Sequence, residues 1–212
     1  FRFDAVCTGL MFSEEQAKIV SEYCERLHDA GTTIFVDPIM GDGGRLYNGM
    51  TNRQVELMRN MVGMADLCFP NYTEASLLTG IPFRNEGMSW NEACQMLDEL
   101  CNLGSKTAII TSAHVEGKSC VVGRRSTLPV NGVLQQQCEG QYFKIDYEEI
   151  PVLFPGGGDI FSAVLIGNLM NNNTLRVSTE KAMDVVSSLI DRNRNLPDKE
   201  GGIPIEQCLD LL

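Results

Sequence analysis

The sequence predicts an α/β protein built on a mainly parallel sheet, and two patterns support this fold class. β-branched and apolar runs alternate with segments that carry helix-capping signals, over residues 3–111 and again near the end of the chain. Such alternation makes consecutive strands parallel, with helices packed on the sheet. Residues 117–154 differ, because polar and apolar positions alternate there around turn signals such as Asn131-Gly132, which predicts antiparallel hairpins.

The first half of the chain supplies the parallel part of this pattern. A strand over residues 3–8 precedes a helix over 13–30, which begins with a capping box. A β-branched strand over 32–37 leads into a glycine-rich loop over 40–47. The next elements are expected in the order helix, strand, helix, helix and strand, at residues 51–64, 66–69, 71–78, 89–103 and 106–111.

Helices return after the hairpin region, at residues 157–171 and 177–194, with a short helix at the end of the chain. The first of them begins at three glycines followed by Asp159 and an apolar run. A helix start of this kind presents backbone N–H groups to an anion. An acid beside a bound phosphate is suited to take a proton from an attacking hydroxyl. The alternative is a glycine-rich turn in which Asp159 only caps the helix.

Composition limits the class of protein. The 212 residues suit one domain, which we expect to span residues 1–212. A net charge of −11 argues against a nucleic-acid surface and gives no sign of membrane binding. Eight scattered cysteines and two histidines indicate reduced thiols in the cytoplasm rather than a zinc site or a disulfide framework. The chain opens without Met on a predicted strand, so a leading portion is expected before Phe1.

Polar residues follow each predicted strand at what would be the carboxyl edge of the sheet, where ligands of open α/β sheets bind. They are Asp37, Asp42, Asn71, Glu74, Thr111, Ser112 and the turn at 156–159. The chain has neither the P-loop motif nor the glycine fingerprint of dinucleotide-binding folds, so a phosphate donor would need another device.

Two long motifs identify the family that the chain resembles. DPIMGDGGRLY at residues 37–47 and PNYTEASLLTG at 70–80 resemble the DPVMGD…LY and PNxxEaxxLtG motifs of the pyridoxal kinases, in the ribokinase-like superfamily. Residues 109–112 match the next strand end of that family, and GGGD at 156–159 stands where the family has GTGD. The resemblance covers essentially the whole chain and implies a three-layer αβα ribokinase-like domain whose N-terminal part precedes these residues.

The resemblance implies ATP-dependent phosphorylation of the 5′-hydroxymethyl group of pyridoxal, pyridoxine or pyridoxamine, a step of vitamin B6 salvage. It also implies Mg²⁺, an activating K⁺ or Na⁺, and a homodimer whose other partners are small molecules. Two alternatives remain open. One is a hydroxymethylpyrimidine kinase of the same superfamily, and the other is a non-catalytic protein that binds a B6 vitamer or a nucleotide.

The resemblance also implies a role for each matched residue. Asp159 would be the catalytic base, and Gly156, Gly157 and Gly158 would form the anion hole. The implied ATP-binding residues are Asp42, Arg45, Tyr47, Thr111, Ser112 and Ile150. The implied metal ligands are Asp37, Asp42, Asn71, Glu74 and Thr111, with Asp42 and Glu74 serving Mg²⁺. As a simpler alternative, Asn71 would be only a helix N-cap and Glu74 its capping-box partner.

Three positions depart from the family pattern. Gly157 replaces a threonine, which removes one hydroxyl donor, and losing such a donor costs roughly 2–4 kcal/mol of barrier in other enzymes. Phe69 stands where some members have threonine, and Leu10 stands where an aromatic residue is common.

Overall fold

The computed structural model describes residues 2–124 and 141–212. The described residues divide into two compact units, one of residues 2–124 and 141–147 and the other of residues 148–212. The predicted Asn131-Gly132 turn lies outside the described residues. Among the helices of the described part, none combines the length and the apolar character needed to cross a membrane.

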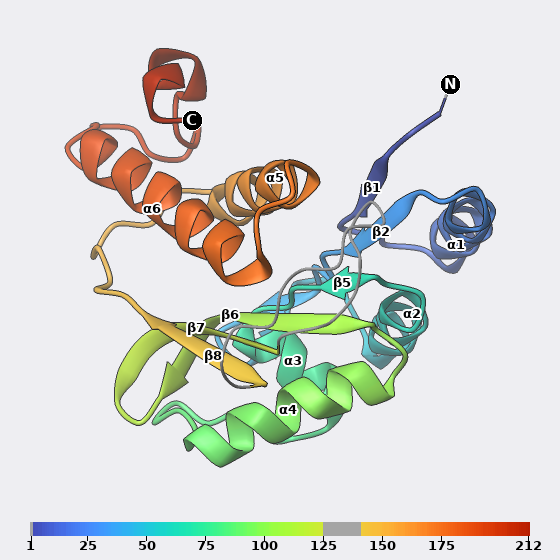
Figure 1. Cartoon of the computed structure of the whole chain (residues 1–212). Coiled ribbons are helices and arrows are strands. Elements are labelled where there is room, and N and C mark those ends of the chain that lie inside the picture. Colours follow the sequence, from blue (N-terminus) through green and yellow to red (C-terminus); the bar gives the residue numbers. More distant parts are fainter. Residues whose placement is uncertain (1, 125–140) are drawn as a thin grey trace. The chain divides into compact units, whose positions relative to one another are not determined.

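The first unit is built on a six-stranded sheet with the order β1-β2-β5-β6-β7-β8 (Figure 1). The strands are β1 Ala5–Thr8, β2 Thr33–Val36, β5 Leu67–Cys68, β6 Thr107–Val115, β7 Lys118–Arg124 and β8 Tyr142–Asp146. The first four pair in parallel. The last three pair antiparallel. The predicted α/β class, with a mainly parallel sheet and an antiparallel region, is confirmed.

Four helices of the first unit cover one face of this sheet. They are α1 Glu14–Asp29, α2 Asn52–Val62, α3 Tyr72–Thr79 and α4 Trp90–Asn102. Their buried side chains pack in a single cluster with every second residue of the strands, such as Ile34 and Val36 of β2. Each helix begins at a complete capping box, because the cap side chains are short and polar and the third helical residue is Gln or Glu.

The second unit is a small helical assembly with its own core. Helices α5 Gly157–Met170 and α6 Leu175–Asn193 pack against each other, and two short 3₁₀ turns follow at Ile205–Gln207 and Leu209–Leu211. The core side chains are Phe154, Ile160, Leu189, Ile203 and Cys208.

The structure adds two features that the sequence pattern did not predict. The glycine-rich loop contains a small antiparallel hairpin, β3 Gly41–Asp42 with β4 Arg45–Leu46. Strand β6 runs to Val115, beyond the predicted end at residue 111, because the chain passes through a left-handed residue, Ser112 with φ 49°, and then resumes pairing with β7. A single irregular residue of this kind allows a strand to bend without ending it.

Candidate active site

Three neighbouring strands bring the predicted polar residues together at the carboxyl edge of the sheet. Asp37 follows β2, Asn71 follows β5, and Thr111 lies within β6. Because β2, β5 and β6 are parallel neighbours, these positions lie in a row. Asn71 and Thr111 form an isolated parallel bridge, and the Thr111 amide donates to the Pro70 carbonyl at 2.9 Å. The topology therefore assembles the edge that the motifs predicted.

Glu74 is the buried carboxylate of this edge. The residue is 3% exposed, and its two carboxylate oxygens accept the Met40 amide at 3.0 Å and the Asn71 amide at 2.9 Å. Burial, opposed by these hydrogen bonds and reinforced by the charge of Asp37, raises the pKa of Glu74 to about 7. Within the described part of the chain, no ion pair involves Glu74. A buried carboxylate of this kind gains from an approaching cation.

The hairpin β3–β4 lies on the first turn of α3. The Asn71 side-chain amide donates to the Gly41 carbonyl at 2.9 Å, and the Gly44 amide donates to the Thr73 hydroxyl oxygen at 2.9 Å. The Tyr47 amide closes the hairpin by donating to the Met40 carbonyl at 2.9 Å. The predicted nucleotide residues Asp42, Arg45 and Tyr47 are exposed on this hairpin.

The pKa of Tyr47 shows that three acidic residues lie near its side chain. Its pKa is raised by burial and then, in decreasing order, by the charges of Glu74, Asp42 and Asp37. Three carboxylates from two segments of the chain therefore act on one phenol. Among the described residues, no group of three or more His, Cys, Asp or Glu side chains is arranged so that it could hold a metal ion by itself. The acids still fit Mg²⁺, which takes one or two carboxylates and completes its shell with water and substrate phosphates.

Ser112, the remaining nucleotide residue predicted in β6, is exposed and has a left-handed backbone. Only small or polar non-glycine residues adopt this conformation with any frequency, and such strain gathers at functional sites. The sequence predicted the residue but gave no signal for its conformation.

The predicted anion turn belongs to the second unit. Gly156, the N-cap of α5, has φ 84° and makes no side-chain capping bond. The first backbone bond of the helix runs from the Ile160 amide to the Gly156 carbonyl, so helix geometry leaves the amides of Gly157, Gly158 and Asp159 without a partner inside the helix. A Cβ atom added at Gly157 or Gly158 would meet nothing within 4 Å. Asp159 is exposed on the first turn, and Ile150 is half-buried before the helix.

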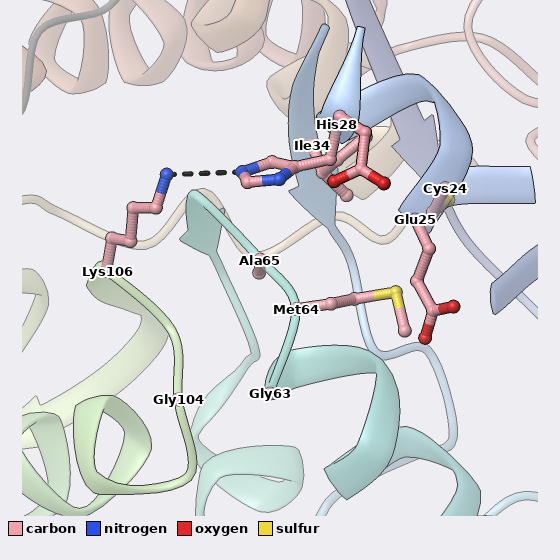
Figure 2. Close-up of a pocket in the computed structure, with 10 residues that line it drawn as sticks. Cys24, Glu25, His28, Ile34, Gly63, Met64, Ala65, Gly104 and Lys106 are labelled. Carbon is pink, nitrogen blue, oxygen red and sulfur yellow. Dashed lines mark hydrogen bonds between the residues drawn. The ribbon is translucent and has the colours of Figure 1, made fainter. Parts of the chain in front are cut away.

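A separate pocket lies at the opposite, amino edge of the sheet (Figure 2). It has a volume of about 370 Å³ and is lined by α1 and by the segments that precede β5 and β6. At its margin the Lys106 ammonium donates to Asp66 at 2.5 Å and lies 3.2 Å from the Nε2 atom of His28. None of the predicted site residues lines this pocket.

The model of the phosphomethylpyrimidine kinase family matches residues 1–204. The chain belongs to this family. The predicted resemblance to the pyridoxal kinases is confirmed as well, since the similar proteins include pyridoxal kinases of several organisms. The chain is 28% identical over 211 residues to a pyridoxal kinase of Arabidopsis thaliana, covering 97% of this chain and 64% of that protein. It is 24% identical over 214 residues to human pyridoxal kinase, covering 95% of this chain and 65% of that protein.

Solved structures of similar proteins share the fold of this chain. A putative phosphomethylpyrimidine kinase from Bacteroides thetaiotaomicron, crystallised with pyridoxal, has a TM-score of 0.85 and 29% identity and covers 100% of this chain and 71% of its own. A Leishmania donovani pyridoxal kinase in complex with ADP and pyridoxamine has a TM-score of 0.77 and 22% identity, covering 98% and 70%. These likenesses confirm the ribokinase-like fold. The chain spans slightly less than two thirds of the curated pyridoxal kinases named above.

Proposed function

We propose that this protein transfers the γ-phosphoryl group of ATP to the 5′-hydroxymethyl group of a B6 vitamer. Family membership supports kinase chemistry, and the named relatives support pyridoxal as the acceptor. The observation that carries the proposal is the start of α5, where open backbone amides and the Asp159 carboxylate lie within one helical turn. Donors for a phosphoryl group and a base for a hydroxyl are the two devices that this transfer needs.

In the proposed reaction, Asp159 accepts the proton of the acceptor hydroxyl. The hydroxyl oxygen forms a bond to the γ-phosphorus, the bond from that phosphorus to the β,γ-bridging oxygen breaks, and ADP leaves. The amides of the glycine turn stabilise the charge on the transferred group. Arg45, Tyr47, Thr111, Ser112 and Ile150 are proposed to hold the nucleotide.

The acidic residues are proposed to serve cations. Asp42, Asn71 and Glu74 would hold Mg²⁺ with the help of water, and Asp37 and Thr111 would hold K⁺ or Na⁺. When bound, Mg²⁺ neutralises phosphate charge. The chain's own contribution at this edge is a fixed carboxylate, Glu74, whose oxygens accept the amides of Met40, just before β3, and of Asn71, the N-cap of α3. A homodimer and a cytoplasmic location stay predictions.

The second candidate is phosphorylation of a hydroxymethylpyrimidine, which the description of the matching family favours. Both acceptors carry a hydroxymethyl group on a nitrogen heteroaromatic ring, so the same base and anion turn would serve either.

The test supplies purified protein with ATP, Mg²⁺ and K⁺ and offers pyridoxal, pyridoxine, pyridoxamine or hydroxymethylpyrimidine in separate reactions. The proposal expects a phosphorylated B6 vitamer as the fastest-formed product. Faster phosphorylation of hydroxymethylpyrimidine would favour the second candidate. Nucleotide binding without transfer to any acceptor would favour the non-catalytic alternative.

A further inference from the structure

The hairpin β3–β4 needs support from outside itself. Each of its strands has two residues, Gly41–Asp42 and Arg45–Leu46, and a hairpin this short is not stable alone in water. Glycines at 41, 43 and 44 leave it few side chains with which to pack. The positions of Arg45 and Tyr47 therefore depend on what holds the hairpin.

The start of the hairpin is held by residues already assigned to the site. Glu74 accepts the Met40 amide, and the Asn71 side chain donates to the Gly41 carbonyl. These two contacts fix the chain where it leaves β2 and enters β3. They do not reach the turn between the two strands.

The turn is held by Thr73, to which neither the motif nor the family resemblance assigns a role. The residue is 2% exposed, and its hydroxyl oxygen accepts the Gly44 amide at 2.9 Å. Gly44 has φ 78° and lies against Phe83, since a Cβ atom at this position would come within 2.7 Å of that ring. Phe83 in turn packs on Tyr72, with ring centroids 4.7 Å apart. The turn thus has one polar and one apolar contact.

We propose that Thr73 is a positioning residue for the nucleotide. Its hydroxyl fixes Gly44 and thereby places Arg45 and Tyr47, while Asn71 and Glu74 hold the opposite end of the hairpin. This inference rests on the proposed function in assigning the nucleotide to the hairpin. It adds a residue that touches neither substrate and acts through the backbone of another segment.

Removing the hydroxyl should loosen only one end of the hairpin. In Thr73→Val the Gly44 amide loses its acceptor, whereas the contacts of Met40 and Gly41 remain. One hydrogen bond of this kind corresponds to about a 3- to 10-fold change in an equilibrium. KM for MgATP should rise by that factor. Because Asp159 belongs to another segment, kcat and KM for the acceptor should stay within about twofold, a split that general destabilisation would not produce.

The experiment compares Thr73→Val with Thr73→Ser and Thr79→Val. Thr73→Ser keeps the hydroxyl and should restore KM for MgATP. Thr79 lies on the same helix, but its hydroxyl donates to the Ala75 carbonyl at 2.8 Å and accepts the Ile81 amide at 3.3 Å. Neither contact involves the hairpin, so Thr79→Val should leave KM for MgATP unchanged. Equal values of KM in wild type and Thr73→Val would overturn the proposal, as would an equal increase in Thr79→Val.

Two further measurements keep the inference separate from the proposed function. Hydrogen exchange should show faster exchange over residues 41–47 in Thr73→Val than in Thr73→Ser, whether or not any vitamer is phosphorylated. Calorimetry with ATP and Mg²⁺ should show the same 3- to 10-fold weakening in the absence of acceptor. If wild-type protein phosphorylates no vitamer while both differences appear, the proposed acceptor is wrong and the role of Thr73 stands.

Gly44→Ala disturbs the same end of the hairpin by another route and serves if Thr73→Val does not fold. Gly44 is exposed and has φ 78°, so alanine strains the backbone of the turn, and the added methyl group meets Phe83 at the margin of the core. KM for MgATP should rise here too. An unchanged KM in this variant would count against the proposal.

Discussion

Helices α3 and α5 begin in opposite ways. At α3, Asn71 accepts the Glu74 amide, and Glu74 accepts the Asn71 amide, so the first turn is closed by side chains. At α5, Gly156 supplies no side chain, and the first amides are left open. Among the helices of the described residues, α1, α2, α4 and α6 resemble α3, each with a side-chain cap. A closed start stabilises the protein, whereas an open start with glycines leaves room for an anion.

The two starts also differ in what the acid of the first turn can do. Glu74 is buried and engaged by two amides, while Asp159 is exposed. The same position of a helix thus holds a buried carboxylate fixed by hydrogen bonds in one case and an accessible carboxylate in the other. The following predictions test that division.

The largest effect is expected at Asp159. Asp159→Asn keeps the shape of the side chain but removes its basicity, so kcat should fall by about 10²–10⁴ while KM for MgATP changes little. The measurement is steady-state phosphorylation of pyridoxal. Asp184→Asn, an exposed carboxylate of α6, is the matched control and should behave as wild type. Wild-type turnover in Asp159→Asn would leave Asp159 as a helix-start residue only.

The next effect is expected at Gly157. Gly157→Thr adds a hydroxyl donor to the open start of α5, and nothing lies within 4 Å of the new Cβ atom. If the hydroxyl reaches the transferred phosphoryl group, kcat should rise by about 30- to 1,000-fold at saturating ATP. Gly157→Val, which has the same shape without the hydroxyl, is the control. Equal kcat values for Gly157→Thr and Gly157→Val would show that the backbone amides alone stabilise the transferred phosphoryl group and that the hydroxyl adds nothing.

At the closed start, Glu74 should make folding stability depend on pH. Its pKa is about 7 in the folded protein, against an ordinary value of 4.5 that applies to the unfolded chain. Between these two pH values the unfolded chain releases a proton that the folded chain keeps. The stability that protonated Glu74 contributes to the fold is fully present below about pH 4.5 and is lost as pH rises to about 7. The free energy of unfolding then falls by at most about 1.4 kcal/mol per pH unit. Urea unfolding at about pH 5.5, 6.2 and 7 measures how the free energy of unfolding changes with pH in wild type and in Glu74→Gln.

Glu92 provides the matched control, because it occupies the same capping-box position at the start of α4. Its hydrogen bond to Arg84 lowers its pKa to about 2, so it stays ionised throughout this pH window. Glu92→Gln should leave the pH slope unchanged, and a slope that also survives in Glu74→Gln would assign the effect to another group.

The smallest effect is expected at the cap of α1. Ser13 accepts the Gln16 amide at 3.1 Å on the protein surface. Ser13→Ala should lower the free energy of unfolding by about 1 kcal/mol and leave kcat and both KM values unchanged. A change in kinetics would mean that closed helix starts far from the site also affect activity.

The fold could be predicted largely from local sequence. The capping boxes at Ser13, Thr51 and Ser89 were read correctly, because an N-cap and its third helical residue interact within one turn. The parallel order of strands followed from their alternation with helices. The hairpin β3–β4 was missed because two-residue strands carry no periodic signal.

The sequence by itself determined the family and the candidate site residues, since the motifs at 37–47, 70–80 and 156–159 identified both. Only the tertiary structure decided how some of them are held. Glu74 serves at once as a capping-box acid and as the acceptor for Met40, and Thr73 reaches Gly44. These partners lie about thirty positions apart, and no propensity or spacing rule predicts such contacts, because they depend on how the sheet brings distant segments side by side.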